Sequence, residues 1–139
     1  MTINSRNKGA GFERELAREL LLLTGITFAR DLEQYRQTDR GDLLADDPAW
    51  PFVVEAKRYA DGTGCKREWQ AQAEAAANAA GKFPCVIYKF DRREIRVSLP
   101  LNAIGAGFNA HPETPDIWAD ISLEGFAWLA SEIMAWRAE

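Results

Sequence analysis

Two carboxylates and a lysine stand in two neighbouring apolar segments of this chain. Asp42 precedes the first segment, and Glu55 and Lys57 lie within the second, thirteen and fifteen positions further on. A buried charge is costly unless it is paired or coordinates an ion, so the three charges are explained more easily together than separately. A divalent cation bound between the two carboxylates would remove their repulsion and keep both ionised at neutral pH. We therefore predict a divalent metal site.

The chemistry of this predicted site is indicated by its donor atoms. Ligands that are all oxygen suit Mg²⁺ best, with Mn²⁺ as the other candidate. Residues i and i+2 of a strand point to the same face, so Glu55 and Lys57 are expected to enter one site. The lysine ammonium can orient a water, lower the pKa of that water, or stabilise charge that develops around phosphorus in a transition state. Together these groups indicate phosphodiester hydrolysis.

The elements that must position these residues are predicted from periodicity and turn-forming residues. Gly41 precedes the first apolar segment and Asp46-Asp47-Pro48 separates the two, as in a short hairpin. A helix with Phe12, Leu16, Leu20 and Leu23 on one stripe precedes them, ended by Gly25 as a C-cap. In chain order we expect a helix over 9–24, a strand over 26–32, a loop over 33–40, the hairpin, a helix over 66–80 ended by Gly81, a second hairpin with strands over 83–90 and 94–99, a strand over 117–121, and a helix capped by Ser122.

Two motifs resemble those of a known family. The segment Gly41-Asp42 … Glu55-Ala56-Lys57 resembles the motif of the PD-(D/E)XK nucleases, with Gly41 where that family often has proline. Upstream, residues 7–16 resemble the opening of the Holliday-junction-resolvase branch, in which a basic residue and a glycine precede a helix with a metal-facing glutamate. Glu13 is the matching position. Downstream, Trp69-Gln70-Ala71-Gln72 resembles the segment that follows E-x-K in phage and archaeal resolvase-like nucleases.

This resemblance covers about residues 5 to 97 and implies a fold and a set of site residues. The implied fold is an α/β restriction-endonuclease-like core, a mixed central β-sheet flanked by helices, in the order α-β-β-β-α-β-β with a C-terminal strand and helix. Asp42, Glu55 and Glu13 are the implied ligands of Mg²⁺ or Mn²⁺, with Glu13 acting directly or through water. For Glu13 the alternative is an ordinary acid on the helix surface. Gln70 or Gln72 could face the metal or the scissile phosphate, with Gln72 favoured by the resemblance and a solvent-facing amide as the alternative for each.

The charge distribution bears on contacts with nucleic acid. The net charge of −4 counts against a strong nonspecific grip on DNA. Residues 1–100 nevertheless hold 16 basic and 15 acidic side chains, whereas residues 101–139 hold one basic and six acidic. The first part can thus present a modest positive face while the acidic tail stays away from it. The residues that we expect to contact phosphates, each with solvated surface charge as the alternative, are Lys8, Arg14, Arg30, Arg36, Arg40, Arg58, Lys66 and Arg67.

Length and composition indicate one domain over 1–139, and the resemblance implies a nuclease domain with its core over about 5–100 and an acidic, Trp-containing extension over 101–139. The chain has no long apolar run and no secretory leader, so we expect no membrane partner and a cytoplasmic location, in a bacterium or a phage-infected host cell. Cys65 and Cys85 lack metal spacing, and His111 is expected in an exposed loop.

Three tryptophans follow in the extension, Trp118, Trp128 and Trp136. Aromatic residues at helical spacing beside Leu and Ile usually belong to a core or an interface, so stacking on nucleic acid is the weaker interpretation. A contact within a homodimer is the stronger functional one. Two symmetric incisions in a four-way junction need two sites related by a twofold axis, which a homodimer supplies.

The first hypothesis is a metal-dependent DNA endonuclease, a hydrolase similar to Holliday junction resolvases, that acts on branched or junction DNA in recombination. A nicking or repair endonuclease on another DNA structure is an alternative. A catalytically silent DNA-binding or assembly module of the same fold is another, and the negative net charge favours it. The presence of Asp, Glu and Lys together argues against that silent module.

Overall fold

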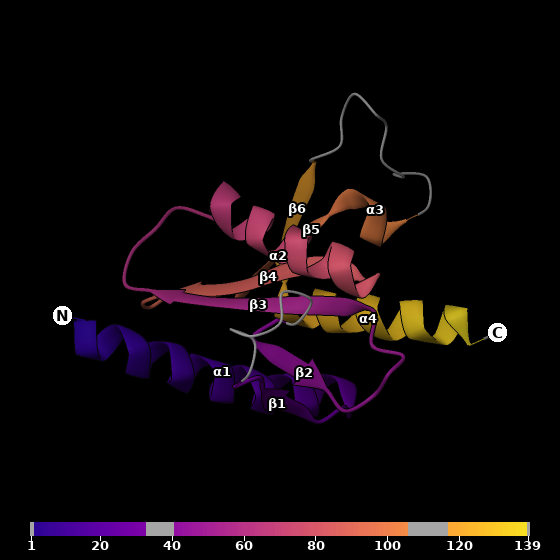
Figure 1. Ribbon diagram of the computed structural model, residues 1–139, viewed down its shortest axis with the longest axis horizontal. Coiled ribbons are helices and arrows are strands. Elements are labelled where there is room, and N and C mark those ends of the chain that lie inside the picture. The colour runs from indigo at the N-terminus through magenta and orange to yellow at the C-terminus, as the bar shows by residue number, and fades with distance from the viewer. Residues whose placement is uncertain (1, 33–40, 106–116, 139) are drawn as a thin grey trace.

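The computed structural model describes residues 2–32, 41–105 and 117–138, and of residues 2–7 the backbone alone. A six-stranded sheet forms its middle layer (Figure 1). The strands lie in space in the order in which they occur in the chain, and all neighbours are antiparallel except one parallel pair, β3 and β4. The strands are β1 (Phe28–Arg30), β2 (Leu43–Ala45), β3 (Phe52–Tyr59), β4 (Phe83–Phe90), β5 (Arg96–Pro100) and β6 (Trp118–Ser122).

Helices cover both faces of this sheet (Figure 1). The four are α1 (Thr2–Thr24), α2 (Arg67–Ala80), the one-turn α3 (Leu101–Ile104) and α4 (Leu123–Arg137). Helices α1 and α4 pack on one face and on each other, whereas α2 packs on β3 and β4 from the other. Helix α2 is also the crossover that parallel neighbours require, because it joins the end of β3 to the start of β4.

The alternation along β3 decides which side chains face α2. Phe52 and Val54 belong to the core beneath α1 and α4, whereas Val53 packs with alanines of α2. Because the side-chain period of a strand is two, Glu55 and Lys57 share the face of Val53. The predicted common face of these two charged residues is therefore confirmed.

The predicted order of elements is confirmed, with changes at their ends. Helix α1 begins seven positions earlier than predicted, the strand expected over 26–32 is limited to 28–30, and α3 was not predicted. Gly25 and Gly81 adopt left-handed φ values of 77° and 68°, as expected of residues that end helices. The hydroxyl of Ser122 accepts a hydrogen bond from the Gly125 N–H at 3.0 Å, which confirms it as the cap of α4. The loop expected over 33–40 and His111 lie outside the described residues.

One prediction about an apolar side chain was wrong. Leu23 is 39% exposed instead of facing the core. Leu21 and Leu22 before it are exposed as well, so the last turn of α1 extends past the core that Phe12, Leu16 and Leu20 enter. Trp128 and Trp136 lie exposed on α4, so of the predicted core or interface placement the interface remains for both, with stacking on nucleic acid as the weaker alternative. No described helix is long and apolar enough to cross a membrane.

Candidate active site

Asp42 lies directly before β2, and hydrogen bonds fix it against β3. Its N–H donates to the carbonyl oxygen of Val54 at 2.8 Å, and its Oδ2 accepts from the N–H of Ala56 at 2.7 Å. The residue is 8% exposed. These two bonds bracket Glu55, so the Asp42 carboxylate is held beside the middle of β3.

Gly41 permits this close approach of the chain to β3. A Cβ at this position would stand 2.3 Å from the carbonyl oxygen of Val54 and 2.9 Å from its carbon. Both distances are far below van der Waals contact, and the neighbouring atoms are backbone that cannot move aside cheaply. The proline that related nucleases often have here would collide with β3, so the departure of this sequence from that pattern has a steric reason.

Glu55 is a buried carboxylate with an unsatisfied oxygen. The residue is 2% exposed, and its Oε2 has no hydrogen-bond partner among the described residues. Burial raises the pKa of Glu55 to about 8, and the charge of Asp42 and a hydrogen bond with it act in the same direction. The positive charge of Lys57 opposes this rise. A buried polar atom without a partner is costly, so this oxygen is placed for a ligand outside the chain.

Glu13 approaches the two carboxylates from α1. Its Oε1 accepts a hydrogen bond from Nε of Arg30 at 2.8 Å. Burial raises the pKa of Glu13, the bond to Arg30 opposes this, and the nearby charge of Asp42 raises it further. Over the described ranges, however, no three His, Cys, Asp or Glu side chains gather closely enough to surround one ion. The structure therefore presents Asp42 and Glu55 as a pair, with Glu13 near it but bonded to Arg30.

Lys57 connects the site to α2. Its Nζ donates to Oε1 of Gln72 at 2.9 Å, whereas Nε2 of Gln70 donates to the hydroxyl of Ser98 at 3.1 Å. Of the two glutamines that the sequence left open, Gln72 is thus the one that contacts a candidate catalytic residue. Its amide oxygen fixes the position of the ammonium next to Glu55.

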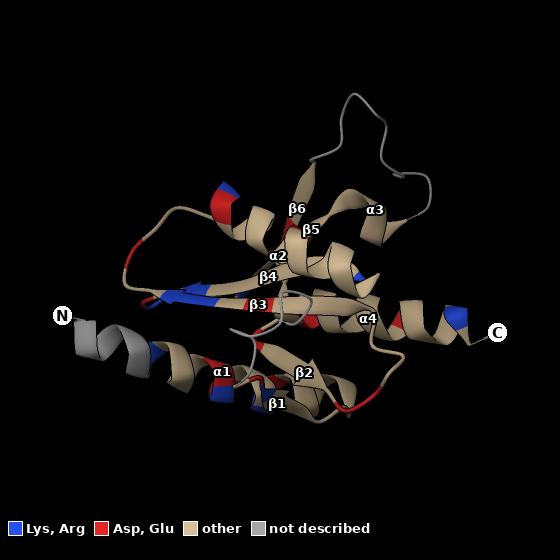
Figure 2. Ribbon diagram, viewed as in Figure 1, with Lys and Arg blue, Asp and Glu red and all other residues tan. Residues whose placement is uncertain are grey.

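The basic residues predicted to contact DNA have different surroundings. Lys8 and Arg58 both form ion pairs with Asp91, at 3.2 Å for Lys8, although they lie far apart in sequence. Arg30 is bonded to Glu13 as described above, so its charge is already partly compensated. Figure 2 shows basic residues at the C-terminal ends of β3 and β4, where Lys57 lies.

The remaining predicted contacts lie on the helices or outside the described residues. Arg14 is exposed on α1, and Arg67 is the exposed first residue of α2. The ammonium of Lys66 lies 5.7 Å and 5.5 Å from the ring centroids of Tyr59 and Trp69, which stack on each other. Arg36 and Arg40 fall within 33–40 and lie outside the described residues.

The structure also brings residues to this face that the sequence did not single out. Parallel pairing places Tyr88 of β4 directly opposite Lys57, and antiparallel pairing places Arg96 of β5 opposite Tyr88. The alternation of β4 could have indicated that Tyr88 and Phe90 share one face, but not that this face adjoins Lys57. That adjacency depends on a strand pairing across more than thirty residues.

A mixed sheet flanked by helices, with Asp42, Glu55 and Lys57 beside its one parallel pair, is the architecture of the PD-(D/E)XK nucleases. Residues 4–138 match the model of the family described as "phage putative PDDEXK endonuclease", and the chain belongs to this family. The predicted membership of the PD-(D/E)XK superfamily is thereby confirmed.

The comparison with solved structures agrees with the fold. The chain is similar to Hjc of Archaeoglobus fulgidus, described as a Holliday junction resolvase from an archaeal hyperthermophile, with a TM-score of 0.57 and 17% sequence identity. The likeness covers 88% of this chain and 98% of that chain. No curated protein sequence matches the chain. The structural match confirms the expected restriction-endonuclease-like core.

Proposed function

We propose that this protein is a metal-dependent DNA endonuclease that hydrolyses phosphodiester bonds in branched or junction DNA. The observation that carries the proposal is the buried pair Asp42 and Glu55 beside Lys57 in a member of an endonuclease family. Asp42 holds the N–H of Ala56, but the buried charge of Glu55 beside it has no compensating structural bond among the described residues and weakens the metal-free fold.

The donor set fits a hard divalent cation, Mg²⁺ or Mn²⁺. Glu55 offers a buried oxygen without a partner, and its raised pKa reflects a negative charge that lacks compensation. Asp42 and Glu55 would hold the ion, and Glu13 would complete the site directly or through water. When bound, the cation supplies a Lewis acid that compensates charge on the phosphate and favours ionisation of a water.

Lys57 and Gln72 supply the remaining part of the reaction. The ammonium of Lys57 is held by the amide oxygen of Gln72 at 2.9 Å. From there it assists the attacking water and stabilises negative charge that develops on the phosphate oxygens. Gln72 is then a positioning residue, because it acts through the lysine.

Junction DNA and a homodimer are proposed for related reasons. The structural likeness to a protein described as a Holliday junction resolvase supports branched DNA as the substrate. Trp128 and Trp136, 66% and 76% exposed on α4, are candidates for a contact between two copies, which would supply the two sites that paired incisions need. We also propose that the protein acts in the cytoplasm of a bacterium or of a phage-infected host cell.

Cleavage of labelled DNA tests this proposal. A four-way junction, a linear duplex and a single strand would each be incubated with Mg²⁺ or Mn²⁺ and with the native protein, Glu55→Gln or the control Glu132→Gln. Glu132 is an exposed acid on α4. We expect paired incisions in the junction that Glu55→Gln abolishes and Glu132→Gln leaves intact. Cleavage of the duplex alone would support a nuclease but contradict junction DNA as its substrate. Binding without cleavage of any DNA would favour a silent DNA-binding module.

A further inference from the structure

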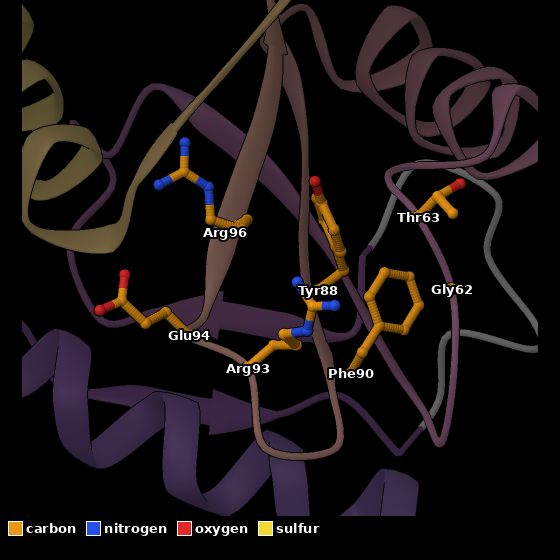
Figure 3. A pocket seen from close by; sticks show the side chains of 7 residues that line it. All are labelled: Gly62, Thr63, Tyr88, Phe90, Arg93, Glu94 and Arg96. Carbon is orange, nitrogen blue, oxygen red and sulfur yellow. The ribbon is translucent and has the colours of Figure 1, made fainter.

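A pocket of about 460 Å³ opens next to the candidate active site (Figure 3). This volume lies within the range of about 300 to 1,000 Å³ that is typical of small-ligand sites. Its walls come from three places in the chain. The loop after β3 contributes Gly62 and Thr63, β4 contributes Tyr88 and Phe90, and the β4–β5 turn with the start of β5 contributes Arg93, Glu94 and Arg96.

Strand register places this pocket close to the candidate catalytic residues. Tyr88 is the register partner of Lys57, and Arg96 is the partner of Tyr88. Adjacent strands lie about 4.8 Å apart, so Arg96 stands about 10 Å across the sheet from Lys57. One DNA strand rises about 3.4 Å per nucleotide. A strand with its scissile phosphate at Lys57 therefore reaches the pocket within two or three nucleotides.

Aromatic rings form one wall of the pocket. Tyr88 and Phe90 lie edge to face with their ring centroids 5.6 Å apart. Gly62 fixes the neighbouring wall, because a Cβ there would stand 2.2 Å from the Phe90 ring. Tyr88 and Phe90 are only 4% and 7% exposed, so they present a narrow, rigid apolar strip to the pocket and no open ring face. Such a strip can lie against the sugar and the edge of the base of a bound nucleotide.

The charged groups of the pocket are unequally compensated. Arg96 donates to Asp120 at 2.6 Å, and the hydroxyl of Tyr88 donates to the same carboxylate. Among the described residues, by contrast, the guanidinium of Arg93 has no hydrogen bond or ion pair. Figure 3 shows Arg93 directed toward the aromatic wall and Glu94 directed away from it. The pocket thus combines an uncompensated cation with an aromatic surface.

We propose that this pocket binds one nucleotide of the cleaved DNA strand, two or three positions from the scissile phosphate. The phosphate of that nucleotide contacts Arg93, and its sugar and the edge of its base lie against the apolar strip of Tyr88 and Phe90. This inference rests on the proposed function, since it names a second contact of the same substrate. It adds a contact through Arg93 to the phosphate contacts that the sequence indicated, none of which is a residue of the β4–β5 turn.

Binding measurements without metal test the pocket separately from catalysis. Fluorescein-labelled junctions, each with one neutral methylphosphonate or one abasic position in the strand around the incision, would be titrated in EDTA and followed by anisotropy. The proteins compared would be the native chain, Arg93→Ala and Arg92→Ala. Arg92 is the matched control, because it lies next to Arg93 in the same turn, is exposed, and does not line the pocket.

For the native protein we expect one position, two or three nucleotides from the cut, at which the methylphosphonate weakens binding about tenfold and the abasic modification weakens it less. Arg93→Ala should weaken binding of unmodified DNA by a similar factor, lower the salt slope by about 0.7 to 0.9, and abolish the effect of the methylphosphonate at that position. Arg92→Ala should keep the native profile. Equal losses in the two variants, or a flat modification profile, would overturn the pocket as a nucleotide site.

Cleavage assays in Mg²⁺ test the proposed function separately from the pocket. Cleavage that Glu55→Gln abolishes, together with a flat modification profile, would retain the nuclease and reject the pocket. A position-specific profile that Arg93→Ala abolishes, without cleavage of any DNA, would retain the pocket and reject the nuclease.

Discussion

Replacement of Glu55 by glutamine should stabilise the metal-free protein at alkaline pH while it abolishes cleavage. The carboxyl titrates near 4.5 when unfolded and near 8 when folded, because it is buried next to Asp42. The folded state therefore holds the proton more tightly than the unfolded state does. The stability that this proton contributes is complete below about pH 4.5 and is lost as the pH rises through 8. Glutamine keeps the shape of the side chain and removes this titration.

The size of the effect follows from the two pKa values. Between about pH 6 and about pH 8.5 the unfolded carboxyl stays ionised, whereas the folded one changes from protonated to mostly ionised. One pKa unit corresponds to about 1.4 kcal/mol, so Glu55 should lower the free energy of unfolding by about 2 to 3 kcal/mol over this interval. Other groups titrate as well, so the quantity to compare is the difference between the native protein and Glu55→Gln at each pH.

Urea unfolding in EDTA measures this difference. At pH 6 and pH 8.5 the native protein, Glu55→Gln and the exposed control Glu132→Gln would be unfolded, with the slope m checked for constancy. We expect the native protein and the control to lose stability together, and Glu55→Gln to lose about 2 to 3 kcal/mol less. Added Mg²⁺ should stabilise the native protein at pH 8.5 and leave Glu55→Gln unchanged. Parallel pH dependence of the native protein and Glu55→Gln would refute the argument from burial.

Three further substitutions test the structure around the site. Asp42→Asn should lose Mg²⁺ binding in calorimetry yet unfold near the native urea midpoint, because it keeps an acceptor for the N–H of Ala56. Asp42→Ala removes that acceptor and should lower the free energy of unfolding by about 1 to 3 kcal/mol. Gly41→Ala should lower the free energy of unfolding by about 1 to 3 kcal/mol and reduce cleavage, because its Cβ meets the β3 backbone; a native melting curve would contradict this. Gln72→Leu should lower kcat with little change in KM, because it releases Lys57, and Gln72→Glu should recover part of the loss; an equal rise in KM would instead indicate a DNA contact.

Local patterns in the sequence predicted most elements of the fold and the residues of its centre. Two-residue alternation placed Glu55 and Lys57 on one face, and turn-forming residues marked the hairpin that brings Asp42 to them. Gly81 and Ser122 ended and began their helices as expected, because a left-handed residue and a hydroxyl cap are set by a few neighbouring residues.

Such local patterns could not predict contacts between segments that are distant in the sequence. Lys8 and Arg58 meet at Asp91 only because α1 and the β4–β5 turn lie together, so the compensation of two expected phosphate contacts could not be predicted. The choice between Gln70 and Gln72 likewise depends on how α2 is rotated over the sheet. Periodicity identifies a buried face, but it does not say what lies opposite that face.

The order of the strands in space has a consequence for how the site is assembled during folding. Each strand pairs with its neighbours in sequence, so Asp42 and Glu55 are joined through a hairpin whose connection covers only residues 46–51. The entropy cost of closing so short a loop is small, and pairings between sequence neighbours favour rapid folding. The two carboxylates can therefore meet without contacts from distant segments, and the helices that bury them need only dock on a hairpin already in register.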